Sequence, residues 1–416
     1  MQEYLVIQAA RFGDLVQTKR LILSLLRSGR VHLLVDQGLR PLAERLYPQV
    51  QVHCLNFHSR LTQACDLEGN LEALARLPVT RVFNCNYSGL STSVCRLFER
   101  EQIAGYRPPL RGRGIERSKL LRHIARLTRK RALAAMNLVD VWAHLVPCPV
   151  PPKAVNPVAK GQGRGLGIVL AGQEARRSLP PEILADLIRV YVSLHQCRSI
   201  VFFGTAHEKK VSHLLRRALP GNLQRLITDL CGKTDFAGLM EALQGLDLVL
   251  SPDTGTMHLC AHLGVPVRAF FLSSACCHET GPYVLGHGIW QVQTPCAPCL
   301  EKSPCRHDLA CLNPLKSREF LRSVSLIEEN GVISVDLPAD LQYWQSDCDE
   351  LGAWARLVAG KDPWQAERRY IRQWLHGLIF RQSVGHSAKL STEQAAALDA
   401  LLVDDSDWML PPKRFA

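Results

Sequence analysis

Long apolar runs and aromatic residues are scarce in this chain of 416 residues. Phe, Trp and Tyr make up 6% of it, and no stretch approaches about 18 uninterrupted apolar residues, which excludes a predicted transmembrane helix. The first residues carry neither a positively charged region nor an apolar segment of signal-peptide length, so we expect a cytoplasmic protein. With 47% apolar and 21% charged residues, the composition is that of a folded chain and excludes disorder, collagen and coiled coil as the main organisation.

Acidic residues are outnumbered, 38 against 50 basic ones, which gives a formal net charge of +12. Most of the excess lies in residues 96–131, where twelve basic residues accompany three acidic ones. Such a stretch favours an anionic partner, namely nucleic acid, an anionic membrane or a phosphorylated substrate, although a solvated helical face is an equal alternative. Only Phe98 and Tyr106 supply aromatic rings there, so a stacking platform for nucleic-acid bases is poorly supported.

Apolar strands alternate with segments of helical spacing in both halves of the chain, which predicts an α/β fold with parallel sheets. The first half offers strands at residues 4–8, 31–35, 50–55 and 81–84, with a helix at 15–26. The second half offers strands at residues 166–170, 199–203, 247–251 and 267–271, separated by helices. Two doubly wound units of this kind are expected to face each other across a cleft, with ligands at the carboxyl ends of the strands.

A proline-rich segment at residues 147–153 and a glycine-rich one at 161–165 mark the boundary between the halves. We therefore predict an N-terminal domain at residues 1–155 and a C-terminal domain at 160–335. Residues 336–416 differ, since they hold five of the seven tryptophans and an amphipathic pattern at 364–380. We expect this last segment to be a helical tail that packs on the two domains.

The clearest motif is Ser-Pro-Asp-Thr-Gly-Thr-Met-His at residues 251–258, which follows an apolar strand and opens a helix. Gly255 leaves the first turn bare, so backbone N–H groups can meet an anion, and Thr254 and His258 lie four residues apart on one helix face. These groups predict a phosphate-binding cradle. Asp253 stands where an N-cap is expected, and a helix cap is the simpler interpretation of the motif.

A second motif, Gly13-Asp14, joins the first strand to the first helix. Gly13 permits close approach of the backbone, and Asp14 is a candidate general base. An N-cap role for Asp14 is the structural alternative, and a helix N-terminus lowers the basicity of a carboxylate. Such a base would act on a hydroxyl that loses its proton late, as the new carbon–oxygen bond forms.

Two more loops follow strands at the same expected sheet edge. Arg177 could neutralise a diphosphate, and Glu208 could accept hydrogen bonds from sugar hydroxyls. Charged loop residues are common, so the argument depends on the convergence of these loops on one edge.

In this order the motifs resemble glycosyltransferase family 9, the heptosyltransferases of lipopolysaccharide core assembly and their relatives. The resemblance covers roughly residues 4–320 and is most specific at residues 253–266. Its other elements are Gly13-Asp14, residues 177–180, residues 204–208 and the segment Cys-Gly-Lys-Thr at 231–234. The chain departs from the family at Leu179, where a tryptophan is usual, and after residue 323, where no counterpart is recognised.

The resemblance implies a GT-B fold of two Rossmann-like domains and an inverting transfer of heptose from ADP-heptose. It implies that Asp14 is the catalytic base and that the donor is bound by Gly13, Arg177, Glu208, Lys233, Asp253, Thr254, Gly255 and His258. Cationic side chains and a helix dipole can stabilise the departing diphosphate, so no cofactor is required for catalysis. The expected acceptor is a lipopolysaccharide core precursor. The alternatives are a protein acceptor such as flagellin or an autotransporter, or a non-catalytic basic protein that binds nucleotides or nucleic acid.

In this family the N-terminal domain receives the acceptor, and it contains the basic stretch. Arg122, Arg126 and Arg129 lie at near-helical spacing and are expected to share one anion-binding face. We therefore expect peripheral contact with the anionic inner membrane face and no nucleic-acid partner.

Fifteen cysteines are many for a reducing compartment. Four of them lie within 16 residues and include a C-x-x-C pair: Cys296, Cys299, Cys305 and Cys311. This set suits a structural Zn²⁺ or Fe site, and a compact loop of reduced thiols is the equal alternative.

Overall fold

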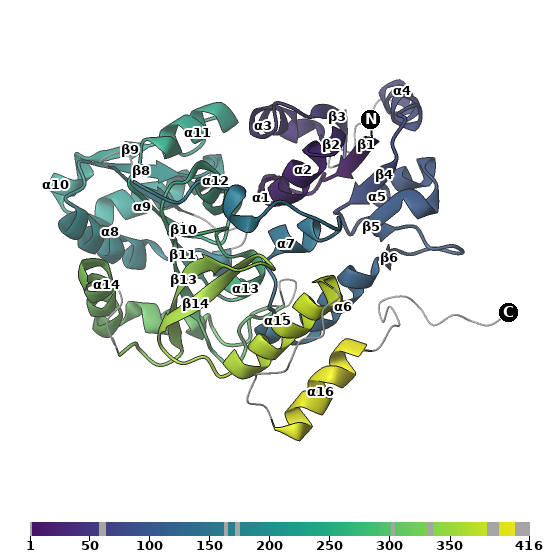
Figure 1. The fold of residues 1–416 in the computed structure, drawn as a ribbon. Coiled ribbons are helices and arrows are strands. Elements are labelled where there is room, and N and C mark those ends of the chain that lie inside the picture. The colour runs from purple at the N-terminus through teal and green to yellow at the C-terminus, as the bar shows by residue number, and fades with distance from the viewer. Residues whose placement is uncertain are drawn as a thin grey trace. The chain divides into compact units, whose positions relative to one another are not determined.

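The computed structural model describes residues 2–57, 64–161, 165–170, 175–300, 304–330, 336–380 and 391–403 (Figure 1). Within these ranges the chain forms two compact units. Unit 1 holds the residues up to Ala134, Leu138–Pro151 and the residues from Arg369 on, whereas unit 2 holds Ala135–Asn137 and Pro152–Arg368.

Unit 1 is built on a six-stranded sheet in the order β3-β2-β1-β4-β5-β6. The first five strands are parallel: β1 (Gln2–Ile7), β2 (Gly29–Asp36), β3 (Gln51–Leu55), β4 (Arg81–Asn84) and β5 (Ile103–Arg107). The short β6 (Glu116–Arg117) pairs antiparallel with β5. The helices before residue 151 are α1 (Phe12–Gln17), α2 (Lys19–Leu26), α3 (Arg40–Leu46), α4 (Ala64–Ala75), α5 (Gly89–Val94), α6 (Lys119–Leu127) and α7 (Leu138–Ala143).

The helix predicted at residues 15–26 is two helices in the structure. α1 ends at Gln17 and α2 begins at Lys19, and Thr18 between them donates its hydroxyl to the Leu15 carbonyl at 2.6 Å. This side-chain hydrogen bond competes with the backbone hydrogen bonds of a helix and favours a break at this residue. The apolar spacing runs through the break without interruption and therefore did not reveal it.

Unit 2 contains an eight-stranded sheet in the order β14-β13-β12-β11-β10-β7-β8-β9. Its parallel strands are β7 (Gly165–Val169), β8 (Ser199–Phe203), β9 (Ile227–Asp229), β10 (Leu248–Pro252), β11 (Val267–Phe271) and β12 (Gly288–Val292). The strands β13 (Leu341–Cys348) and β14 (Ala353–Ala359) continue it antiparallel. Its helices are α8 (Pro181–His195), α9 (Lys209–Ala218), α10 (Gly221–Gln224), α11 (Phe236–Gln244), α12 (Gly255–Leu263), α13 (Cys277–Thr280) and α14 (Arg318–Asn330).

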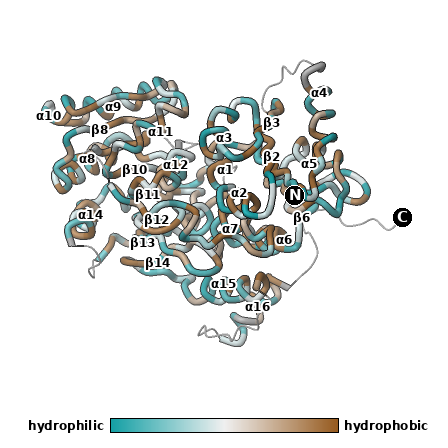
Figure 2. Tube along the Cα trace, turned by 45° about the horizontal axis from the view of Figure 1, so that its top comes forward, coloured by the Kyte–Doolittle hydropathy of each residue, from teal (hydrophilic) through white to brown (hydrophobic). Residues whose placement is uncertain are grey.

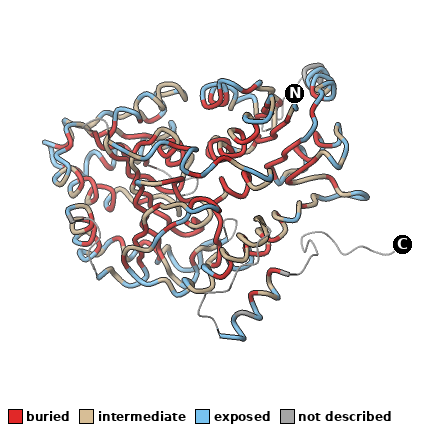
Figure 3. The backbone as a smooth tube through the Cα atoms, in the orientation of Figure 1, coloured by how far each residue is buried: buried red, intermediate tan, exposed pale blue. Residues whose placement is uncertain are grey.

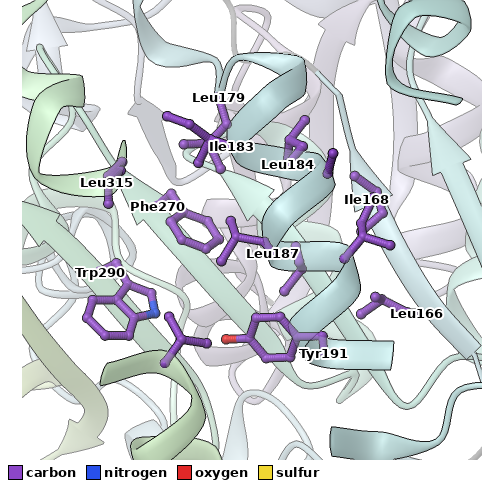
Figure 4. Packing of buried hydrophobic residues seen from close by; sticks show 14 of the residues in the cluster. Leu166, Ile168, Leu179, Ile183, Leu184, Leu187, Tyr191, Phe270, Trp290 and Leu315 are labelled. Atoms are coloured by element: carbon purple, nitrogen blue, oxygen red, sulfur yellow. The ribbon is translucent and has the colours of Figure 1, made fainter. Parts of the chain in front are cut away.

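The core of unit 2 lies between this sheet and α8. Leu166 and Ile168 of β7 face Ile183, Leu184 and Leu187 of α8, as Figure 4 shows. All five side chains are buried, and the strands of both units run through the buried interior in Figure 3. β12 is buried throughout, as expected of a strand covered on both faces.

The predicted helical tail is corrected by the structure. Residues 341–348 and 353–359 are strands that extend the sheet of unit 2, because alternate residues of this segment point into the core. The helix α15 (Gln365–Phe380) begins in unit 2 and continues in unit 1, and α16 (Thr392–Val403) belongs to unit 1. In Figure 3 most of α16 is exposed, while Leu398 and Leu402 are buried.

No helix within the described ranges is both long enough and apolar enough to cross a bilayer.

A buried ion pair joins two helices of unit 1. Arg20 of α2 lies 2.6 Å from the Asp140 carboxylate of α7, and the two side chains are only 2% and 0% exposed. The Arg20 Nε also donates to the Val150 carbonyl at 2.9 Å. The charged groups therefore satisfy each other in the absence of water.

We expect Asp140→Asn to lower the free energy of unfolding by about 3–5 kcal/mol, because it leaves the Arg20 guanidinium buried without its counter-charge. Denaturant unfolding measures this change. Asp186→Asn is the matched control, since its pair with Arg189 is exposed on α8, and we expect it to cost less than about 1 kcal/mol. Equal effects in the two variants would contradict the role of the buried pair.

Candidate functional site

The candidate site lies at the carboxyl edge of the parallel sheet in unit 2. The loops that follow β7, β8, β9, β10 and β11 all leave the sheet at this edge, since parallel strands end on the same side. Every sequence-predicted donor residue except Gly13 belongs to one of these loops or to the helix that follows it.

The turn between β10 and α12 leads from a strand into a helix as predicted, with one correction to its cap. Thr254, not Asp253, is the N-cap: its backbone is extended (φ −143°, ψ 167°), and its hydroxyl accepts from the Met257 N–H at 3.4 Å. Gly255 is the first helical residue, so the first turn of α12 presents backbone N–H groups beside a residue without a side chain. Such a terminus favours an anion.

Asp253 is instead the centre of a side-chain cluster. It is 6% exposed, and one carboxylate oxygen accepts from Arg177 Nη2 at 2.5 Å and from the Thr280 hydroxyl at 3.1 Å. Arg177 Nη2 also donates to the Asp253 carbonyl at 2.9 Å. The aspartate therefore ties the loop after β7 and the helix α13 to the β10–α12 turn. It could not serve as the cap because its carboxylate makes these stronger charge-assisted contacts.

His258 lies on α12, one turn after Thr254, and its Nε2 is 3.8 Å from the other Asp253 carboxylate oxygen. Burial, reinforced by the charge of Arg177, lowers the pKa of His258 to about 3. The ring is therefore neutral at physiological pH and offers one N–H donor but no charge.

The two neighbouring loops are shaped by local contacts. Glu208 ends the short helix η7 (Ala206–Glu208) and accepts from both the backbone N–H and the hydroxyl of Thr205 at 2.7 Å. Lys233 is exposed, and its ammonium group donates to the Asp229 carbonyl at 2.7 Å. The Gly232 N–H donates to the Gly204 carbonyl at 2.9 Å, which joins the loops after β8 and β9. The structure thus gives Glu208 a capping role in addition to its predicted one.

Asp14 is in unit 1, in the first turn of α1, and is half-buried. The N-cap of this helix is Arg11, so the alternative of an N-cap role for Asp14 is not what the structure shows. Gly13 is buried beside it, and the Gln17 side chain donates to the Gly13 carbonyl at 3.3 Å. Burial lowers the pKa of Lys19, at the start of α2, to about 8.

The family model of glycosyltransferase family 9 (heptosyltransferase) matches residues 170–309. This range contains Arg177, Glu208, Lys233, Thr280 and the whole β10–α12 turn. Residues 170–309 are a glycosyltransferase family 9 domain.

Over 73 residues the chain is 29% identical to lipooligosaccharide heptosyltransferase 2 of Haemophilus influenzae, a match that covers 18% of this chain. The chain thus spans about a fifth of that relative, since the match covers 21% of its length.

Solved structures share the fold at low identity. The glycosyltransferase of family 9 from Veillonella parvula has a TM-score of 0.56 at 15% identity, over 70% of this chain and 88% of that one. The E. coli heptosyltransferase WaaC with ADP has a TM-score of 0.52 at 15% identity, over 69% and 92%. The E. coli ADP-heptose LPS heptosyltransferase II has a TM-score of 0.51 at 15% identity, over 78% and 100%. These solved structures confirm the predicted GT-B fold class, and the family model agrees with the predicted resemblance to glycosyltransferase family 9 over residues 170–309.

Three of the four clustered cysteines lie in the family 9 domain, and Cys311 lies two residues beyond its end. Cys296 and Cys305 are exposed, Cys299 is half-buried and Cys311 is buried. Burial raises the pKa of the Cys311 thiol, and the charge of the other three cysteines adds a smaller increase. The four thiols are not arranged as a ligand set, because the described ranges hold no group of three or more His, Cys, Asp or Glu side chains fit for a metal ion. The Zn or Fe site remains a prediction.

The expected basic face in unit 1 is corrected at Arg126. This side chain is 2% exposed, and its Nη1 donates to the Leu402 carbonyl of α16 at 3.2 Å. Arg122 is half-buried and Arg129 exposed, so the three arginines do not share one solvent face. Spacing along α6 could not reveal that a helix from the end of the described chain packs against it.

Three polar residues near Asp253 were missed in the sequence. Thr280 binds Asp253, whereas Ser273 and Ser274 follow β11, the strand next to β10. Both serines are buried, and neither hydroxyl has a hydrogen-bond partner within the described residues. The only available signal was their position just after a predicted apolar strand.

Two buried histidines of unit 2 predict a loss of stability in acid. Burial, followed by the charge of a nearby arginine, lowers the pKa of His258 and of His287 to about 3, from 6.5. Below about pH 6.5 these two histidines bind protons in the unfolded chain but stay neutral in the folded chain. Their contribution to the free energy of unfolding is therefore complete above that pH and is lost as the pH falls toward 3.

We expect His287→Gln to reduce the fall in Tm between about pH 7.5 and about pH 4.5, since the variant loses one such proton uptake. Thermal melting at the two pH values tests it. His213→Gln, at an exposed position on α9, should melt like the parent at both. An unchanged pH dependence in His287→Gln would show that this ring is not the group responsible.

Proposed function

We propose that this protein is an inverting glycosyltransferase that transfers a heptose from ADP-heptose to a hydroxyl of a lipopolysaccharide core precursor. The observation that carries the proposal is the β10–α12 turn of the family 9 domain, where a bare helix N-terminus lies beside the Arg177–Asp253 pair. The named relatives act in lipooligosaccharide or LPS heptose transfer, or bind ADP, and so support this choice of donor and acceptor. A nucleotide sugar as donor implies a cytoplasmic location.

In the proposed reaction, the acceptor hydroxyl attacks the anomeric carbon of the heptose from the face opposite to the diphosphate. The new carbon–oxygen bond forms as the bond from that carbon to the phosphate oxygen breaks, and ADP leaves with the electron pair. The Asp14 carboxylate accepts the hydroxyl proton.

Charge compensation decides how the leaving diphosphate is stabilised. Arg177 pairs with Asp253, so this pair brings little net positive charge. The first turn of α12, the Thr254 hydroxyl and the exposed Lys233 are left as the main electrostatic contributors. Asp253 then holds the Arg177 guanidinium in place, and the remaining N–H groups of that guanidinium are the proposed donors to the diphosphate. No metal or other cofactor is required by these groups, and Zn or Fe at the cysteine loop would be structural.

Thr254→Ala should weaken ADP binding by about 1.5–3 kcal/mol, because the variant loses the hydroxyl that donates a hydrogen bond to the charged diphosphate. Since Thr254 is also the N-cap, the same change should cost about 1 kcal/mol of stability. Calorimetric titration with ADP, combined with thermal melting, separates the two effects. Thr254→Ser keeps the hydroxyl and should retain the affinity for ADP. If it loses as much ADP affinity as the alanine variant, the proposed contact between the hydroxyl and the phosphate is wrong.

Asp14→Asn should lower kcat about 10²–10⁴-fold while ADP affinity is kept, because an amide cannot accept the proton. A steady-state assay with ADP-heptose and a heptose-deficient core precursor measures the effect. Glu182→Gln is the control, since Glu182 is an exposed acid in the first turn of α8. Near-normal kcat in Asp14→Asn would reject Asp14 as the base.

A further inference from the structure

The loop between β5 and β6 is the most exposed apolar feature of unit 1. Leu110 in this loop is 81% exposed, which is the highest value among the large hydrophobic side chains of the described residues. Arg111 and Arg113 follow it and are exposed, and neither makes an ion pair with an acidic residue within the described ranges. Gly112 and Gly114 take positive φ angles of 80° and 136°, which turn the chain back so that the loop projects from the sheet edge (Figure 1).

Other exposed apolar side chains gather near this loop. Of the eight large hydrophobic side chains that are exposed in the described residues, four come from one stretch of 24 residues: Tyr87, Leu90, Leu97 and Leu110. α5 and the β5–β6 loop lie side by side in Figures 1 and 2. Tyr87, just before α5, contacts Tyr106 of β5 at a centroid distance of 5.4 Å and lies under the Arg117 guanidinium at 4.5 Å. These contacts hold α5 against the base of the loop.

The base of the loop is braced by ion pairs, whereas no ion pair is found at its tip within the described residues. Glu116 of β6 pairs with Arg107 at 3.1 Å and also with Arg100, which in turn donates to the Pro108 carbonyl. One acid thus serves two arginines below the tip. The tip itself presents a leucine followed by two cationic side chains, and Arg96 is exposed next to Leu97 on the neighbouring segment.

We propose that the β5–β6 loop, together with the exposed face of α5, is a membrane-binding surface that inserts Leu110 into the interface of an anionic phospholipid bilayer. An apolar tip followed by two exposed arginines is complementary to acyl chains below a layer of negative headgroups. A nucleic acid would match the charge but leave Leu110 in water, and the nearest ring, Tyr87, is already covered by Arg117. The surface adds to the proposed function a contact with the membrane that holds the acceptor.

Vesicle flotation of the full-length protein tests this surface without any transfer reaction, so it can fail while the proposed function stands. We expect binding to phosphatidylcholine vesicles that contain phosphatidylglycerol, little binding to phosphatidylcholine alone, and weaker binding at high salt. Each basic side chain near an anionic surface contributes about fivefold in partitioning. The double variant Arg111→Glu/Arg113→Glu should therefore bind at least about 25-fold more weakly.

The matched control is Arg217→Glu/Arg225→Glu, which makes the same change in net charge at exposed positions of unit 2. It should bind vesicles like the parent. Equal losses in the two double variants would show that net charge alone drives binding and would overturn the proposed surface. Absence of parent binding to the anionic vesicles would overturn it as well, and binding of a DNA oligonucleotide in its place would assign the basic stretch to nucleic acid.

Insertion of the tip has its own readout. Leu110→Trp should show a blue-shifted emission on addition of anionic vesicles and quenching by brominated acyl chains, whereas Leu214→Trp, at an exposed leucine of α9, should show neither. If the emission of Leu110→Trp does not change when vesicles are added, insertion is rejected. If it changes only with protein concentration, insertion is also rejected, and the tip is assigned to contact between copies of the chain.

Discussion

The ion pair between Arg177 and Asp253 is the contact on which the candidate donor site depends. It joins the loop after β7 to the turn after β10, two strands that are neighbours in the sheet, and Thr280 adds a third segment through the same carboxylate oxygen. A buried carboxylate without these donors would be costly and would repel a diphosphate. The pair therefore permits an acid at this position, and in the proposed reaction it leaves the diphosphate to the helix terminus and to Lys233.

Much of the fold could be predicted because its strands are short apolar runs that end at one edge. The strands predicted at residues 81–84, 199–203 and 267–271 have the same bounds in the structure, and the other two predicted strands of unit 2 are displaced by one residue. The identity of the α12 cap could not be predicted, because Asp253 and Thr254 are both good caps and only the tertiary contact with Arg177 decides between them.

The failures share one physical cause, which is pairing between segments distant in the chain. Residues 341–359 were assigned to a helical tail, yet they pair with β12 and with each other. Arg126 was assigned to a basic surface, yet α16, more than 260 residues further on, covers it. A periodic pattern shows which face of an element is apolar or charged, but not which partner covers that face.

The helix α15 passes from one unit into the other without a break, and residues 135–137 belong to unit 2 although both flanks belong to unit 1. Neither unit is therefore a single stretch of chain. A fragment that stops before residue 369 would leave α6 without its cover, and one that stops before residue 341 would also give the sheet of unit 2 an open edge at β12. A chimaera that exchanges unit 1 between relatives must consequently carry three separate segments of the chain, with one junction inside a helix.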